Sequence, residues 1–107
     1  MSIPVELTDL PAEIARIGPS ALLVTAAADG PPHVASVVVR VDGERLAMGA
    51  GRKTRANAAR QRAVTLVWPR AVDPDYCLIV DGAAEGDGEP FVVRPTAAVL
   101  HRLSTAP

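Results

Sequence analysis

The spacing of apolar and polar residues predicts a chain made mostly of short β-strands. Strand-like runs, apolar or alternating with a period of two, cover residues 21–28, 33–41, 45–50, 63–68, 76–84 and 91–103. Two segments have a helical pattern instead. Leu10, Ile14 and Ile17 lie at i, i+4 and i+7, and an alanine-rich segment runs from 54 to 62 with Thr54 as its candidate N-cap. The predicted order is helix, three strands, helix, three strands.

Turn-forming residues separate these elements. Gly18 should end the first helix, and Asp42 with Gly43 predicts a tight hairpin. Asp81 and Gly82 interrupt an otherwise apolar strand and predict a β-bulge. Short strands joined by tight turns are typical of an antiparallel sheet that closes into a small barrel. We therefore expect a mainly β fold with short helices, a six-stranded antiparallel barrel.

The composition predicts a homodimer and argues against several kinds of partner. The 107 residues fit one domain covering 1–107. A hydrophobic content of 49% and a mean hydropathy of +0.20 are high for so small a chain, so we expect apolar surface to be buried in a homodimer. A net charge of −1 and 3% aromatic residues argue against nucleic-acid binding. The single cysteine fits a cytoplasmic protein, and no apolar run is long enough to span a membrane.

The most distinctive polar stretch is Gly-Ala-Gly-Arg-Lys-Thr-Arg-Ala-Asn at residues 49–57. Residues 51–62 contain five basic side chains and no acidic one. Main-chain N–H groups at a glycine-led helix start can bind an anion, and nearby cations add charged donors. The candidate donors are Arg52, Lys53, Arg55, Thr54 and Asn57. The pattern is neither a Walker loop nor a dinucleotide fingerprint. It predicts a phosphate site, and the alternative is a solvated basic helix face.

The valine-rich strand at 33–41 offers a second candidate surface. Its period of two places Val34, Ser36, Val38 and Arg40 on one face. Such a face could form an apolar wall for a flat ring, with Ser36 and Arg40 bonding to the edge of that ring. The alternative is a strand buried on both faces, with Arg40 extending its charge to water.

The remaining reactive residue types give no catalytic pattern. Trp68 could stack on a ligand or pack at a dimer seam, and the alternative is a core position. Cys77 lies in an apolar strand, where an inert packing role is expected. His33 and His101 have no carboxylate or nucleophile close by in sequence. We therefore expect no catalytic acid–base pair and no metal site.

Taken in order, these stretches resemble the pyridoxamine 5′-phosphate oxidase-like split-barrel flavoproteins. The first stretch is Ala-Leu-Leu-Val-Thr at 21–25, followed by Asp-Gly-Pro-Pro-His-Val-Ala-Ser-Val-Val at 29–38. The second is Leu-Ala-Met-Gly-Ala-Gly-Arg-Lys-Thr-Arg-Ala-Asn at 46–57, which is similar to the third strand and phosphate turn of that family. Residues 62–67 and 76–84 resemble later strands. The resemblance extends over roughly residues 14–103 and rests on the order of the motifs.

The resemblance implies a six-stranded split barrel and a homodimer that holds one flavin mononucleotide (FMN) in each of two interface clefts. The phosphate would contact Arg52, Lys53, Thr54 and Asn57. The ring edge would contact the backbone near Ser36, Val37 and Val38. The ribityl chain would pass Met48 and Gly49, and Trp68 would reach the site of the neighbouring subunit.

The resemblance further implies a small flavin-dependent oxidoreductase of unknown substrate. Members of the family commonly have a serine at the start of the phosphate turn and a lysine two positions later. In this chain those two positions hold Arg52 and Thr54, with Lys53 between them. The long C-terminal substrate signature of pyridoxamine phosphate oxidase is absent, which argues against pyridoxal phosphate synthesis. The alternatives are binding of the deazaflavin F420, flavin storage without turnover, and a structural dimer without a cofactor.

Overall fold

The computed structural model, which describes residues 2–86 and 88–105, is mainly β with two short α-helices and one 3-10 helix. In chain order the elements are β1 (Ser2–Val5), η1 (Leu7–Asp9), α1 (Leu10–Ile17), β2 (Ser20–Thr25), β3 (His33–Val38), β4 (Arg40–Asp42), β5 (Arg45–Met48), α2 (Arg52–Arg60), β6 (Ala63–Trp68), β7 (Tyr76–Glu85) and β8 (Phe91–Arg102).

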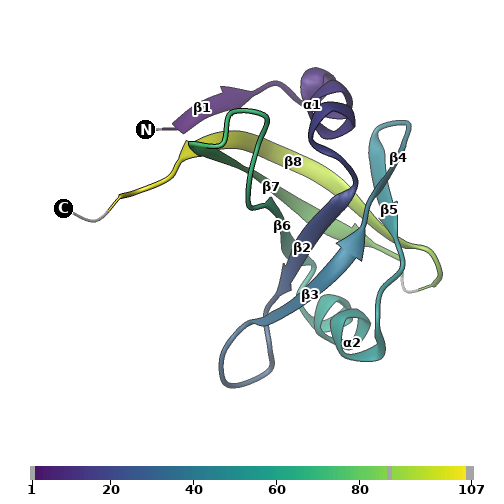
Figure 1. The fold of residues 1–107 in the computed structure, drawn as a ribbon. Helices are drawn as coiled ribbons and strands as arrows, with labels where there is room; N and C mark the ends of the chain where they lie inside the picture. Colours follow the sequence, from purple (N-terminus) through teal and green to yellow (C-terminus); the bar gives the residue numbers. More distant parts are fainter. Residues whose placement is uncertain (1, 87, 106–107) are drawn as a thin grey trace.

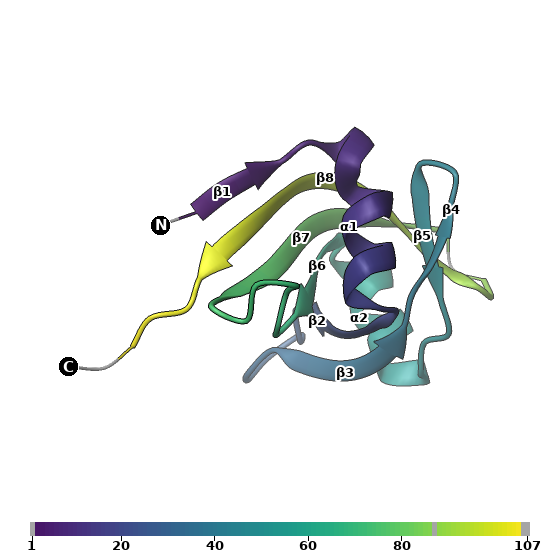
Figure 2. The ribbon, with the colours of Figure 1, turned by 45° about the horizontal axis from the view of Figure 1, so that its top comes forward.

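The strands form one antiparallel sheet that curls into an open barrel (Figure 1). The order is β3-β2-β6-β7-β8-β5-β4, and β1 also pairs with β8. The helices lie at opposite ends of the curled sheet in Figure 1, with α1 near the β4–β5 hairpin and α2 near β2 and β3. Figure 2 shows α1 running across the open side of the curl. The expectation of a mainly β, antiparallel barrel is confirmed.

Alternating burial explains how these residues fill the barrel. In β2 and β6 every second side chain is buried, and Leu23 and Leu66 are completely covered. Helix α1 adds Leu10 and Ile14 to the same core, as its i, i+4 spacing predicts. Burying each such side chain stabilises the fold by about 1.5–3 kcal/mol.

The longest strand, β8, changes its neighbour and its register midway. On one edge it pairs with β7 throughout, while on the other its start pairs with β5 and its end with β1. Opposite β7, the partner of Asp81 is Ala97 but the partner of Gly82 is Pro95. Thr96 is therefore the extra residue of a β-bulge, and its hydroxyl donates to the Asp81 carbonyl over 3.2 Å. The sequence predicted a bulge at Asp81 and Gly82 in β7. The bulge does lie at this level of the sheet, but its extra residue belongs to β8.

The prediction of six strands was wrong, because the described residues form eight. β1 was not predicted, and the expected strand at 33–41 is interrupted at Val39. The Val39 N–H donates to the Pro19 carbonyl over 2.8 Å, after which the chain leaves β2 and pairs with β5. The hairpin turn consists of Gly43 and Glu44, one residue later than expected.

One helix end agrees with the sequence prediction, and another differs from it. Helix α1 ends at Gly18, as expected, where φ is 114° and glycine is strongly favoured. Helix α2 begins at Arg52, with Gly51 and not Thr54 as the N-cap residue. None of the described helices has both the length and the apolar character needed to cross a membrane.

Candidate functional site

The basic segment forms the first two turns of α2. Because the helix begins two residues earlier than expected, Thr54 lies inside it and is only 1% exposed. The Arg55 N–H is bonded to the Gly51 carbonyl over 3.1 Å. The N–H groups of the three preceding residues, 52–54, have no acceptor within the helix. Together with the helix dipole, these groups make this end of α2 favourable for an anion.

Three of the five cations in this segment bind other parts of the chain. Arg55 Nη1 lies 2.6 Å from the Glu89 carboxylate. Arg60 donates to the carbonyl of residue 26 over 2.6 Å, and Arg62 donates to the carbonyl of residue 86 over 2.9 Å. These contacts tie α2 and the residues after it to the β2–β3 loop and the β7–β8 turn.

The other two cations, Arg52 and Lys53, are exposed at the start of α2. Within residues 2–86 and 88–105, neither has an ion pair or a side-chain hydrogen bond. Two charged residues and three main-chain N–H groups thus lie at one helix end, and the described residues provide no acceptor for them. An anion such as a phosphate would satisfy them.

Asn57 was predicted to be a donor for a ligand, but in the structure it anchors the helix. Its Nδ2 donates to Thr25 Oγ1 over 3.1 Å, and both side chains are buried. This contact joins the inner face of α2 to the end of β2. It fixes the position of the helix and so supports Arg52 and Lys53 indirectly.

The second candidate surface is β3, which lies at the end of the sheet order. The Val39 N–H points to the β2 side because it bonds to Pro19. Backbone groups of successive residues point to opposite edges of a strand, so those of Val37, two residues before Val39, also face β2. Those of Ser36 and Val38 face the free edge. Of the three residues predicted to meet a ring edge, Ser36 and Val38 have available backbone groups and Val37 does not.

The outward face of β3 is apolar and exposed. Val34 and Val38 are 54% and 67% exposed, whereas Val37 and Val39 are buried. The alternative interpretation, a strand buried on both faces, is therefore wrong. A shallow hollow of about 420 Å³ lies beside this face, lined by Ser20, Ala21, Leu22, Ser36, Val37, Val38 and Pro69.

Two other predicted site residues have their side chains in the core. Trp68 is 1% exposed and its indole N–H donates to the Gly18 carbonyl over 2.9 Å, so the core interpretation of Trp68 holds and we leave it out of the site. Met48 is 3% exposed, while the next residue, Gly49, is exposed where the chain passes from β5 to α2. Gly49 therefore remains a candidate contact.

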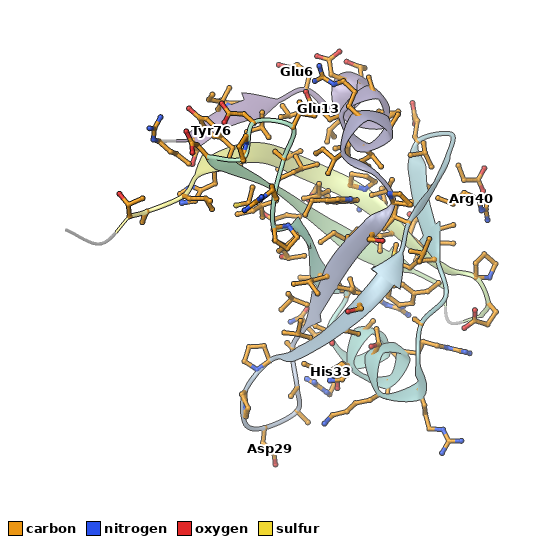
Figure 3. The ribbon with its side chains drawn as sticks, in the orientation of Figure 1. Glu6, Glu13, Asp29, His33, Arg40 and Tyr76 are labelled. Atoms are coloured by element: carbon orange, nitrogen blue, oxygen red, sulfur yellow. The ribbon has the colours of Figure 1, made fainter. Side chains whose placement is uncertain are left out.

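His33 also belongs to this region, although the sequence assigned it no site role. It opens β3 opposite Thr25, and paired residues of antiparallel strands point to the same face. Figure 3 shows the His33 ring beside α2. The pairing with a threonine that itself contacts Asn57 could not be read from local sequence. In the part of the chain that the structure describes, no three His, Cys, Asp or Glu side chains gather as a metal site.

Comparisons with known sequences give partial matches. No protein-family model matches the chain. Uncharacterized proteins of Mycobacterium bovis and Mycobacterium tuberculosis are each 41% identical over 59 residues, a match that spans 49% of this chain but only 42% of each relative. The chain therefore covers less than half the length of these curated relatives.

Solved structures share the fold across most of the chain. An F420 reductase superposes with a TM-score of 0.62 at 22% identity, over 79% of this chain and 94% of its own. A candidate 5-nitroimidazole antibiotic resistance protein from Bacteroides thetaiotaomicron gives 0.62 at 9%, over 94% and 89%. A candidate pyridoxamine 5′-phosphate oxidase from Listeria innocua gives 0.57 at 17%, over 92% and 95%. The chain has the pyridoxamine 5′-phosphate oxidase-like split-barrel fold.

Proposed function

We propose that this chain binds FMN as a small flavoprotein and acts as a flavin-dependent oxidoreductase. The phosphate would lie on the first turn of α2, held by Arg52 and Lys53 and by the main-chain N–H groups of residues 52–54. The ring would lie along the free edge of β3, with the ribityl chain passing Gly49. When bound, FMN would supply the hydride or electron transfer, and the protein would hold and orient it.

One observation carries the proposal: the two cations that have no partner among the described residues lie at the N-terminal end of α2, whereas the other three bind other parts of the chain. This distribution also weakens the nucleic-acid interpretation, which needs a broad set of available cations. The free edge of β3 supports the ring position, because Ser36 and Val38 have backbone groups directed there.

The exposed valines of β3 support a homodimer. Side chains as exposed as Val34 and Val38 favour association, because covering them removes apolar surface from water. A second copy over this face would turn the shallow hollow beside Ser36 into a closed cleft. The flavin would then lie between two protomers.

Titration of the apo protein with FMN, followed by flavin fluorescence, tests the phosphate site. Replacing Arg52 and Lys53 together by alanine should weaken FMN binding by about 2–4 kcal/mol. The control is Arg70→Ala with Arg102→Ala, which removes the same charge from exposed positions outside α2. Equal affinities for the two double variants, with unchanged circular dichroism, would refute the assignment.

F420 is the second candidate ligand, because an F420 reductase shares the fold and the deazaflavin also carries a phosphate. Parallel titrations with FMN and F420 decide between them. Turnover with a nicotinamide donor and a dye acceptor separates an oxidoreductase from a storage protein. Binding of neither flavin would favour the structural dimer.

A further inference from the structure

A second cavity, of about 430 Å³, lies at the other end of the barrel, where β8 exchanges one neighbour for another. β5 pairs with β8 up to Val93, and β1 pairs with it from Ala98 onward. Beside the stretch of β8 between Val93 and Ala98, the two neighbouring parts of the chain diverge. The chain after β1 continues into η1 and α1, and the β4–β5 hairpin turns in the opposite direction. Figure 1 shows α1 facing that hairpin across this part of the sheet. The cavity therefore follows from the split in the strand pairing.

The walls of this cavity are largely apolar. They include Leu10 and Pro11 of α1, Val41 and Leu46 of the hairpin, and Pro95 of β8. Leu10 and Leu46 are core residues, each 2% exposed, so the walls are held by the packing of the barrel. The volume lies in the range of small-molecule sites. If each non-hydrogen atom takes the roughly 30 Å³ of a water molecule, it holds about 14 such atoms.

Two arginines also line the same cavity, Arg45 and Arg94. Both bind the single carboxylate of Glu85, with Nε–Oε distances of 2.6 Å from Arg45 and 3.4 Å from Arg94. Arg45 Nη1 also donates to the Glu44 carbonyl over 3.4 Å. Among the described residues, the Nη atoms of Arg94 have no hydrogen-bond partner. This three-residue cluster has a net charge of +1 and unused donors on Arg94. Glu44, which is exposed and also lines the cavity, opposes that charge.

We propose that this cavity binds a small amphipathic carboxylate, such as a medium-chain fatty acid. The apolar body would lie between α1 and the β4–β5 hairpin, and the carboxylate would accept hydrogen bonds from the Arg94 guanidinium and from Arg45. An apolar enclosure with charged donors on one side matches a ligand that is apolar except at one anionic end. The cavity shares no residue with the proposed flavin site, so the two proposals can fail separately.

Isothermal titration calorimetry of the full chain with decanoate, which is slightly smaller than the volume estimate, tests the proposal. Decanol and decyltrimethylammonium have the same apolar tail with a neutral and a cationic end. We expect saturable binding of decanoate, weaker binding of decanol by about fivefold, and the weakest binding of the cation. Amide shifts in nuclear magnetic resonance spectra should map to α1 and the β4–β5 hairpin.

Three variants sharpen the test. Arg94→Gln should bring decanoate affinity down to that of decanol, and Glu44→Gln should raise decanoate affinity by about twofold by removing a nearby negative charge. Arg102→Gln removes an exposed arginine from the same strand and should change nothing. Equal binding of decanoate and decanol to the unmodified chain would overturn the proposal. So would shifts confined to β3, or shifts of the cavity residues on dilution without ligand, which would indicate that a second copy covers the cavity.

Discussion

Replacing Asn57 by alanine should destabilise the protein more than its small contact area suggests. The change removes the 3.1 Å hydrogen bond to Thr25 and leaves a threonine that is 1% exposed without that donor. The lost bond accounts for about 1 kcal/mol, and the buried hydroxyl without its partner adds about 1–2 kcal/mol. We therefore expect the free energy of unfolding to fall by about 2–3 kcal/mol. The control, Thr65→Val, removes a bond of 2.8 Å to Asp81 at the surface and should cost less than about 0.5 kcal/mol.

Urea unfolding of the apo protein at one fixed concentration measures this change, because a dimer makes apparent stability depend on concentration. A double-mutant cycle with Thr25→Val isolates the pair. Each single variant leaves one buried polar group behind, whereas the double variant leaves neither. The double variant should therefore cost less than the two single changes together, with a coupling of about 1–2 kcal/mol. Strict additivity would mean that the contact does not hold α2 in place.

Three further changes test other parts of the fold. Gly82→Ala should lower the urea midpoint, at a cost of about 1–3 kcal/mol, because its Cβ would lie 2.6 Å from Val93 Cγ1; an unchanged midpoint would show that the strands separate easily there. Trp68→Phe removes the donor to the Gly18 carbonyl and should cost at least about 1 kcal/mol by thermal unfolding, whereas a loss well below this would make the bond unimportant. Val38→Asp should shift sedimentation from the proposed dimer to the monomer without unfolding the chain. An unchanged sedimentation coefficient would contradict a dimer that associates through this face of β3.

The sequence predicted best those elements whose pattern is local. The strand at 63–68 has the predicted limits, since it alternates regularly and Pro69 follows it. β1 was missed because it is four residues long, contains Pro4 and is held only by its pairing with β8. Proline is tolerated there because β1 is an edge strand. The break at Val39 is also invisible locally, since the valine run continues across it.

The sequence located the candidate site but did not show which of its side chains are available to a ligand. The run of cations is plain in the sequence, but which of them are available depends on distant partners. Arg55 binds Glu89, which is 34 residues away, and Arg60 binds a carbonyl at the same separation. Whether Asn57 faces a ligand or the core depends on where α2 begins. The N-cap is Gly51, three residues before the expected Thr54.

The bulge at Thr96 sets the phase of everything that follows it in β8. Before it, Phe91 and Val93 face the core, and after it Ala98 does, so the interval between inward positions is odd. Deleting Thr96 would make this interval even, so Ala98 would still face inward, and Pro95 and Ala97 would become neighbours in a regular ladder opposite Gly82 and Asp81. A single-residue gap at this point therefore removes the bulge and leaves the inward and outward faces of the strand unchanged. An alignment of β8 with a strand that has no bulge has to place its gap at Thr96, because otherwise Ala98 is matched to an outward position.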